Sequence, residues 1–253
     1  MFNDRKVVFK ALVGSHNYNL NDEASDKDWK YFVLPTFDDF YEGKMFSENK
    51  VSTDEDWDAH DIRKLGDLFW KANVNFLEVL YSKDLQGYWR ISELMPSGKL
   101  AVGSANVIKK IFAMRESIVT MNLPYLYSAC KGMYHEKMKR LTKGTEGTQY
   151  LVDKFGYDTK QALHAYRILG FILRFHQYNW DFQRAMTFTD TERTKVLKIK
   201  HGALTIEEFK VVVDTVYNNG FLELEEVYKS QLPDVTTKNK LDRLIKELVR
   251  RNI

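Results

Sequence analysis

The hydrophobic pattern of this chain changes its period once, close to residue 105, and that change restricts the possible folds more than any other feature. Before it, short apolar runs of strand length alternate with short helical patterns. The strand candidates are 6–13, 28–35 and 56–60. After it, apolar residues recur at the spacing of amphipathic helices. We therefore expect an α+β protein, with a small mixed sheet in residues 1–100 and a helical domain in residues 101–253.

Several segments carry more specific expectations. Residues 38–56 are polar and acidic, as is typical of a loop, whereas residues 75–82 are apolar and fit either a strand or a buried helix. Asp61 is placed to cap the N-terminus of a helix. The helix that begins near residue 206 is expected to end at the Asn-Asn-Gly sequence of 218–220.

The charges of the chain are divided unequally. Residues 1–100 carry a net charge of −5 and residues 101–253 a net charge of +8, which suggests cation binding in the first part and contact with a polyanion in the second. No apolar run reaches the roughly 18–20 residues that cross a membrane, and the N-terminus lacks the pattern of a secretory signal. Cys130 is the only cysteine, which excludes an internal disulfide. We expect a cytoplasmic protein without membrane contact; the sequence does not indicate its oligomeric state.

Acidic residues occur where two of the expected strands begin. Asp26 and Asp28 lie two positions apart at the start of a strand, so their side chains project to the same side. A third carboxylate from the strand at 56–60, either Asp56 or Asp58, would complete an all-oxygen site. Such oxygen ligands are those that Mg²⁺ accepts, particularly when the phosphates of a nucleotide supply the remaining ligands. We expect these residues to bind Mg²⁺, with Mn²⁺ as the alternative ion.

A glycine–serine pair follows the first expected strand. Gly14 allows the backbone to approach a phosphate closely, and Ser15 offers the phosphate a hydroxyl group and an amide donor. Two metal ions beside such a corner would activate an attacking hydroxyl group and stabilise a departing pyrophosphate in an in-line displacement. The order of the Gly-Ser pair, the D-x-D pair and the third carboxylate therefore predicts chemistry on a nucleotide.

The segment GSHNYNLNDEASDKDWKYFVLP (14–35) resembles the nucleotidyltransferase signature of the DNA polymerase β superfamily, in which Gly-Ser ends one strand and D-x-D opens the next. The likeness is greatest to the RNA-repair-pathway polymerase-β-like nucleotidyltransferases of bacteria and their phages. Further segments similar to that group are 56–82, 128–141, 157–169 and 197–209, so the resemblance spans most of the chain. One departure is Asn19, because a glycine is usual there in the broader superfamily.

The resemblance implies that the Gly-Ser pair holds the incoming triphosphate and that the D-x-D pair binds the metal ions. The identity of the third carboxylate stays open. Counting back from the Arg63-Lys64 pair, which the family shares, favours Asp56. The pattern of a carboxylate flanked by apolar residues favours Asp58 instead.

Five basic residues are candidates for contact with the phosphates of the nucleotide or the acceptor. Arg63 and Lys64 open the helix after the third carboxylate, where cations oppose the helix dipole. Lys160, His164 and Arg167 recur at helical spacing, and the family shares this K-x-x-x-H-x-x-R pattern. The planar fork of an arginine matches phosphate oxygens. On this interpretation the helical domain completes the cleft for nucleotide and acceptor.

The resemblance implies an enzyme that transfers an NMP from an NTP to a hydroxyl group and releases pyrophosphate. An RNA end is the expected acceptor, because the family is placed in RNA repair and the second part of the chain is basic. Two alternatives stay open. One is nucleotide transfer to a protein or a small molecule, and the other is a nucleic-acid-binding module that has the same fold but no catalytic activity.

Overall fold

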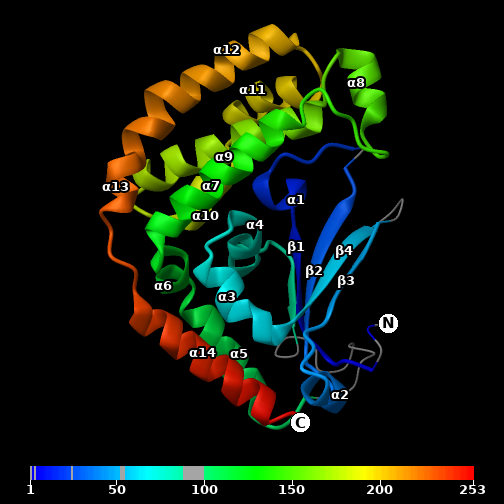
Figure 1. Cartoon of the computed structure of the whole chain (residues 1–253), viewed down its shortest axis with the longest axis vertical. Helices are drawn as coiled ribbons and strands as arrows, with labels where there is room; N and C mark the ends of the chain where they lie inside the picture. The colour runs from blue at the N-terminus through cyan, green and yellow to red at the C-terminus, as the bar shows by residue number, and fades with distance from the viewer. Residues whose placement is uncertain (1, 3, 24, 52–54, 88–99) are drawn as a thin grey trace. The chain divides into compact units, whose positions relative to one another are not determined.

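The chain forms two compact units (Figure 1). The computed structural model describes residues 2, 4–23, 25–51, 55–87 and 100–253. The first unit comprises Met1–Asn17, Asn21–Asn122 and Pro233–Ile253, and the second comprises Tyr18–Leu20 and Leu123–Leu232.

The first unit contains a sheet and the helices around it. Its strands are β1 (Val7–Val13), β2 (Lys27–Val33), β3 (Ser47–Lys50), β4 (Glu55–Asp61) and β5 (Leu85–Gly87). Its helical segments are α1 (Ser15–Tyr18, whose last residue belongs to the second unit), α2 (Phe37–Tyr41), the 3₁₀ turn η1 (Ile62–Lys64), α3 (Leu65–Trp70), α4 (Val74–Leu77), the 3₁₀ turn η2 (Glu78–Tyr81), α5 (Ser104–Ala113), α6 (Arg115–Thr120) and α14 (Val235–Arg250).

The five strands form one sheet in the order β3-β4-β2-β1-β5, of which β1 to β4 are labelled in Figure 1. β1 is antiparallel to both β2 and β5, and β3 is antiparallel to β4. β2 and β4 are parallel. This arrangement confirms the α+β class and the mixed sheet. The parallel pairing also brings the starts of β2 and β4 to the same edge of the sheet.

Aromatic rings form the core on one face of the sheet. Phe9 of β1 stacks on Phe32 of β2 with 4.8 Å between the ring centroids, and Phe112 of α5 meets Phe9 edge to face. Phe9 and Phe32 are almost completely buried. Full burial of one such side chain contributes about 1.5–3 kcal/mol to folding. This stack therefore attaches α5 firmly to the sheet.

Helix α14 joins the sheet unit from the far end of the sequence. Its buried apolar stripe consists of Leu241, Leu244, Ile245, Leu248 and Val249. The helix packs against α3 and α5, which explains why 104–122 and 233–253 group with the sheet. The sequence placed both segments in the helical domain, with a boundary at residue 100. Residues 88–99, next to that boundary, lie outside the described residues.

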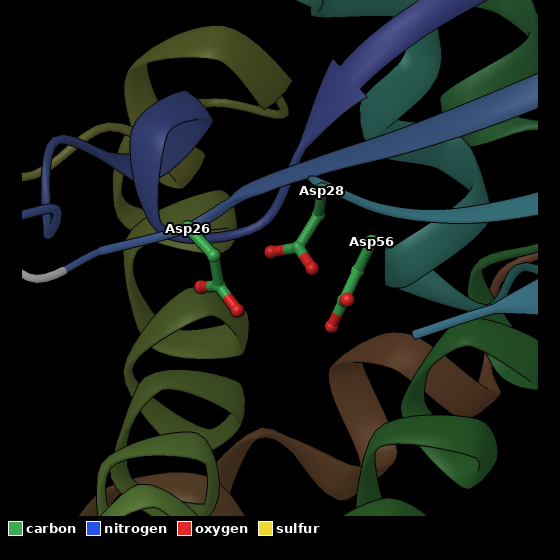
Figure 2. A group of neighbouring side chains, drawn as sticks. All are labelled: Asp26, Asp28 and Asp56. Atoms are coloured by element: carbon green, nitrogen blue, oxygen red, sulfur yellow. The ribbon is translucent and has the colours of Figure 1, made fainter. Parts of the chain in front are cut away.

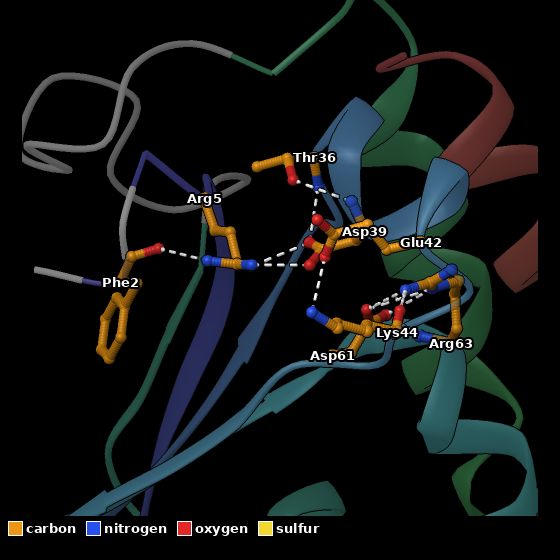
Figure 3. A network of polar contacts seen from close by, with 8 residues as sticks. All are labelled: Phe2, Arg5, Thr36, Asp39, Glu42, Lys44, Asp61 and Arg63. Carbon is orange, nitrogen blue, oxygen red and sulfur yellow. Dashed lines mark hydrogen bonds and ion pairs between the residues drawn. The ribbon is translucent and has the colours of Figure 1, made fainter.

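The segment between β2 and β4 contains a helix and a strand where the sequence predicted a loop. Thr36 and Asp39 form a capping box that begins α2, and Arg5 donates to both carboxylate oxygens of Asp39 at 2.6 and 2.8 Å (Figure 3). Hydrogen bonding to Arg5 lowers the pKa of Asp39 to about 2. β3 is an exposed edge strand without apolar alternation. The loop prediction for 38–56 was therefore wrong for residues 38–41, which lie in α2, and for Ser47–Lys50, while residues 52–54 lie outside the described part.

The second unit is helical, as the sequence predicted. Its segments are α7 (Leu123–Lys139), α8 (Gln149–Phe155), α9 (Thr159–Gln177), α10 (Phe182–Met186), α11 (Asp190–Lys200), α12 (Ile206–Val216), the π-helical turn η3 (Tyr217–Phe221), the 3₁₀ turn η4 (Leu222–Leu224) and α13 (Glu225–Lys229). Helices α7 and α9 pack along each other, and α10, α11 and α12 pack on α9. Among the described residues, no helix combines the length and the apolar character that crossing a membrane requires.

The structure decides two local expectations of the sequence. The predicted helix end at 218–220 is wrong, because the chain continues through η3 and buries Phe221. The ring of Phe221 stacks on Tyr127 with 4.4 Å between centroids, and the Tyr127 hydroxyl donates to the Phe221 carbonyl. The ambiguous segment 75–82 is helical, since it forms most of α4 and all of η2.

Candidate metal centre

Three carboxylates meet at the edge of the sheet where β2 and β4 begin. Asp28 and Asp56 lie opposite each other in the register of the parallel pair, and Asp26 immediately precedes β2. One oxygen atom from each of the three side chains lies within 4.8 Å of the other two. Figure 2 shows the side chains projecting from the two strands into the same space. The parallel register therefore brings together residues that are far apart in the sequence.

The crowding of negative charge changes the acidity of Asp28. Burial, and then the charges of Asp26 and Asp56, raise the pKa of Asp28 from 3.8 to about 6. Lys30 acts in the opposite direction but offsets only part of this rise. A divalent cation held between the three side chains would remove the repulsion, and three carboxylate oxygens are ligands that Mg²⁺ and Mn²⁺ accept. The residues present therefore fit such an ion.

The Gly-Ser pair lies at the same edge of the sheet. β1 ends at Val13, which pairs with Asp28, so the turn that follows places Gly14 against the Asp28 side chain. Gly14 has a φ of +72°, and a β-carbon at this position would overlap the Asp28 carboxylate. Only glycine satisfies both the backbone conformation and the close approach. Ser15 follows directly and begins α1.

A buried carboxylate that the sequence did not single out fixes this corner. Glu78 of η2 is 2% exposed and accepts a hydrogen bond from the Gly14 N–H at 3.0 Å. The Asn17 side chain also donates to Glu78, while its carbonyl oxygen accepts from the Lys83 N–H. The sequence contained one sign of this role, because Glu78 is the only charged residue in the largely apolar run NFLEVLYS (75–82). Glu78 therefore acts as a positioning residue for the turn.

Asp58 is held by other residues of the sheet. It shares a face of β4 with Asp56, but it pairs with Lys30 at 2.6 Å and with the His60 ring at 3.1 Å. Although burial raises the pKa of Asp58, the hydrogen bond from His60 and the charge of Lys30 outweigh this, and its pKa is lowered. The group of three carboxylates contains Asp56, so the geometry favours Asp56 over Asp58 as the third ligand.

Arg63 and Lys64 follow the opposite end of β4. From Asp56 to Asp61 the strand advances about 17 Å, at about 3.3 Å per residue. The Arg63 guanidinium pairs with the fully buried carboxylate of Asp61 at 2.6 Å (Figure 3). Asp61 also caps η1, as the sequence predicted, by accepting from the Arg63 N–H. The structure therefore does not bring Arg63 or Lys64 to the three carboxylates.

Lys160, His164 and Arg167 lie on α9 of the second unit. Arg167 is only 6% exposed, and its guanidinium carbon lies 3.9 Å from the centroid of the Tyr18 ring. A guanidinium nitrogen of Arg167 is 3.4 Å from Nδ1 of His164, and Lys160 and His164 are exposed. Burial against Tyr18 gives Arg167 a packing role within its own unit. The three carboxylates belong to the first unit.

Asn19, the departure from the superfamily pattern, has a left-handed backbone. Its φ is +64°, a conformation that favours glycine and that asparagine tolerates better than most other residues. The Asn19 side chain donates to the carbonyl of Phe188 at 3.0 Å. The asparagine therefore allows the same turn that a glycine would and adds a hydrogen bond.

No protein-family model and no curated protein matches the chain at a significant level.

Proposed function

We propose that the protein is a Mg²⁺-dependent nucleotidyltransferase of the DNA polymerase β type, which moves an NMP from an NTP to the hydroxyl group of an RNA end. The observation that carries this proposal is the meeting of Asp26, Asp28 and Asp56 beside the Gly14-Ser15 corner. The resemblance of residues 14–35 to the superfamily signature supports the same reaction. RNA is the proposed acceptor because residues 101–253 carry a net charge of +8.

In this reaction the acceptor hydroxyl oxygen bonds to the α-phosphorus, and the bond from that phosphorus to pyrophosphate breaks. Asp26, Asp28 and Asp56 would hold the metal ions, which when bound neutralise the triphosphate and lower the pKa of the hydroxyl group. Asp56 accepts the proton that leaves the hydroxyl oxygen. The Gly14 N–H already donates to Glu78, so Ser15 is the residue of the corner that contacts a phosphate.

The test combines the full-length protein with each labelled NTP and mixed cellular RNA, with and without Mg²⁺. We expect a labelled RNA product only in the presence of the metal. Asp26→Asn and Asp56→Asn should each reduce transfer at least about a hundredfold, because each removes one charged ligand. Asp38→Asn is the matched control, since Asp38 is an exposed aspartate of α2 outside the carboxylate group. Its transfer rate should equal that of the unchanged protein.

Other outcomes identify the alternatives. If the label appears in protein or in a small molecule and not in RNA, the proposed acceptor is wrong, but the proposed reaction still holds. Salt-sensitive RNA binding without pyrophosphate release from any NTP indicates a binding module of the same fold. Normal turnover by Asp26→Asn contradicts the assignment of the metal ligands.

We place this reaction in the cytoplasm. Cys130 is the only cysteine of the chain, and its thiol is completely buried, which raises its pKa to about 12. A fold without disulfides and with an inert thiol suits a reducing compartment. Localisation of a tagged full-length protein in cell fractions tests this placement.

A further inference from the structure

The first unit contains a groove along one side of α14, lined by residues from Lys238 to Arg250 of that helix. Its volume is about 690 Å³, which lies within the range of about 300–1,000 Å³ that is typical of small-molecule pockets. Besides α14, the groove is lined by residues of α2, η1 and α3 and by the end of the chain. The groove is thus built entirely from elements of one unit.

The floor of the groove is apolar. Ile245 and Val249 of α14 contribute buried side chains to it, and Phe40 and Ile253 contribute side chains that remain 44% and 58% exposed. Apolar side chains this exposed at the mouth of a cavity leave a surface that an apolar ligand can cover. The floor therefore favours a ligand with a hydrocarbon body.

The charges around the groove are predominantly positive. Its two carboxylates, Asp67 and Asp242, are both paired with Lys238, at 3.2 and 2.5 Å. Lys246 and Arg250 lie one helical turn apart on α14 and are exposed. Neither forms an ion pair within the described part of the chain. Two adjacent cations that no described carboxylate engages in an ion pair suit an anionic group.

The groove is separate from the candidate metal centre. Arg63, which lines it, follows the end of β4, whereas Asp56 lies near the beginning of that strand. Arg63 is held in place by the buried Asp61 carboxylate (Figure 3). Its guanidinium group also lies over the Phe40 ring, 4.4 Å from the ring centroid. These contacts fix one wall of the groove without any ligand.

We propose that this groove binds a small amphiphilic anion. The hydrocarbon body lies on Phe40, Ile245 and Val249, and a carboxylate, sulfate or phosphate head lies between Lys246 and Arg250. This site is additional to the proposed transfer reaction and does not depend on it.

The test is isothermal titration of the full-length protein with decanoate below its micellar concentration. Decyltrimethylammonium, with the same chain length and the opposite charge, is the matched ligand control. We expect decanoate to bind with a one-to-one stoichiometry and at least about tenfold more tightly than the cation, because only the anion is attracted by Lys246 and Arg250. Equal binding of the two ligands, or no binding of decanoate, overturns the proposal.

Three variants and one control variant locate the site. Lys246→Glu and Arg250→Glu should each weaken decanoate binding about tenfold, whereas Lys240→Glu, a charge reversal at an exposed lysine of α14 outside the groove, should leave it unchanged. Ile253→Ser, which removes an exposed apolar side chain, should weaken binding about threefold. Because all four positions are exposed, melting temperatures should not change.

Unchanged affinity in both Lys246→Glu and Arg250→Glu overturns the placement of the head group. Vesicles of phosphatidylglycerol distinguish a free amphiphile from a lipid surface. If the vesicles retain the protein and the Lys246→Glu variant is not retained, the anionic head belongs to a membrane lipid. This result overturns the proposal of a small free ligand.

Discussion

A β-carbon on Gly14 would overlap the carboxylate of Asp28, so the glycine and the candidate metal ligand occupy one tightly packed corner. We expect Gly14→Ala to move the Asp28 carboxylate and to lower transfer about a hundredfold, because a displacement of about 1 Å has effects of this size. The positive φ of +72° adds a loss of stability of about 1–2 kcal/mol. Transfer assays and thermal melts measure the two effects.

Gly43→Ala is the matched control for this substitution. Gly43 has a φ of +65°, but a β-carbon there would meet nothing within 4 Å. The control should therefore lose stability from backbone strain alone and retain full transfer. Equal transfer rates for the two variants would show that the close approach of Gly14 to Asp28 is not needed for transfer.

Asp28→Asn should raise the stability of the metal-free protein and weaken its binding of Mg²⁺. The substituted amide carries no charge, so it removes both the cost of burying a charge and the repulsion from Asp26 and Asp56, which together raise the pKa of Asp28. We expect the metal-free variant to be more stable at pH 7 by an amount on the order of 1 kcal/mol, after allowance for screening by solvent. We also expect Mg²⁺ to stabilise it much less than it stabilises the unchanged protein. Chemical denaturation with and without Mg²⁺ measures both quantities, and a metal-free variant that is less stable at pH 7 contradicts the prediction.

The effect of Mg²⁺ should depend on pH through Asp28. The pKa of Asp28 is about 6 in the folded protein and 3.8 when the chain is unfolded. Between pH 3.8 and pH 6 the folded state therefore binds the Asp28 proton more strongly than the unfolded state does. The metal-free protein therefore loses stability from this group as the pH rises from about 4 to about 6, and the loss is then constant. Because Mg²⁺ competes with the proton, its stabilising effect should grow through pH 6 and level off above it.

Melting curves with and without Mg²⁺ from about pH 5 to pH 8 check this dependence. The Asp28→Asn variant is the control, because it cannot take up that proton. A Mg²⁺ effect of the same size at pH 5 and at pH 8 would show that Asp28 is not a ligand.

Asn17→Asp should disturb the support of the Gly14 turn. Asn17 is completely buried and donates to the Glu78 carboxylate at 3.3 Å, so the substitution replaces a donor with a second negative charge. We expect a loss of stability of about 1–3 kcal/mol, measured by chemical denaturation. Asn239→Asp, on the exposed surface of α14, should change stability by less than about 0.5 kcal/mol. If Asn17→Asp loses no more stability than Asn239→Asp, Asn17 does not support the turn.

The class of fold and two of the three grouped carboxylates could be predicted from local patterns. Asp26 and Asp28 are two residues apart at the start of a strand, and alternation alone places them on one side. The choice between Asp56 and Asp58 could not be made in this way, because both lie on the same face of β4. It depends on the parallel register, which pairs Asp56 with Asp28 and Asp58 with Lys30.

Elements that depend on distant contacts were the ones that the sequence did not show. β3 has no apolar alternation because all four of its residues are exposed, so only its pairing with β4 defines it. The turn η3 overrides a local stop signal because Phe221 gains a stacking partner in Tyr127. By contrast, α2 could have been found, since Thr36 and Asp39 have the spacing of a capping box.

The N–H of Asp234 donates to the carbonyl of Met121 at 2.7 Å, and both residues belong to the first unit. The polypeptide therefore leaves that unit and re-enters it at neighbouring points. Apart from Tyr18–Leu20, the second unit is a single insertion in the sequence of the first. Because the Asp234 N–H and the Met121 carbonyl are hydrogen-bonded to each other, the two ends that Leu123–Leu232 connects lie close together, whatever the length of chain between them.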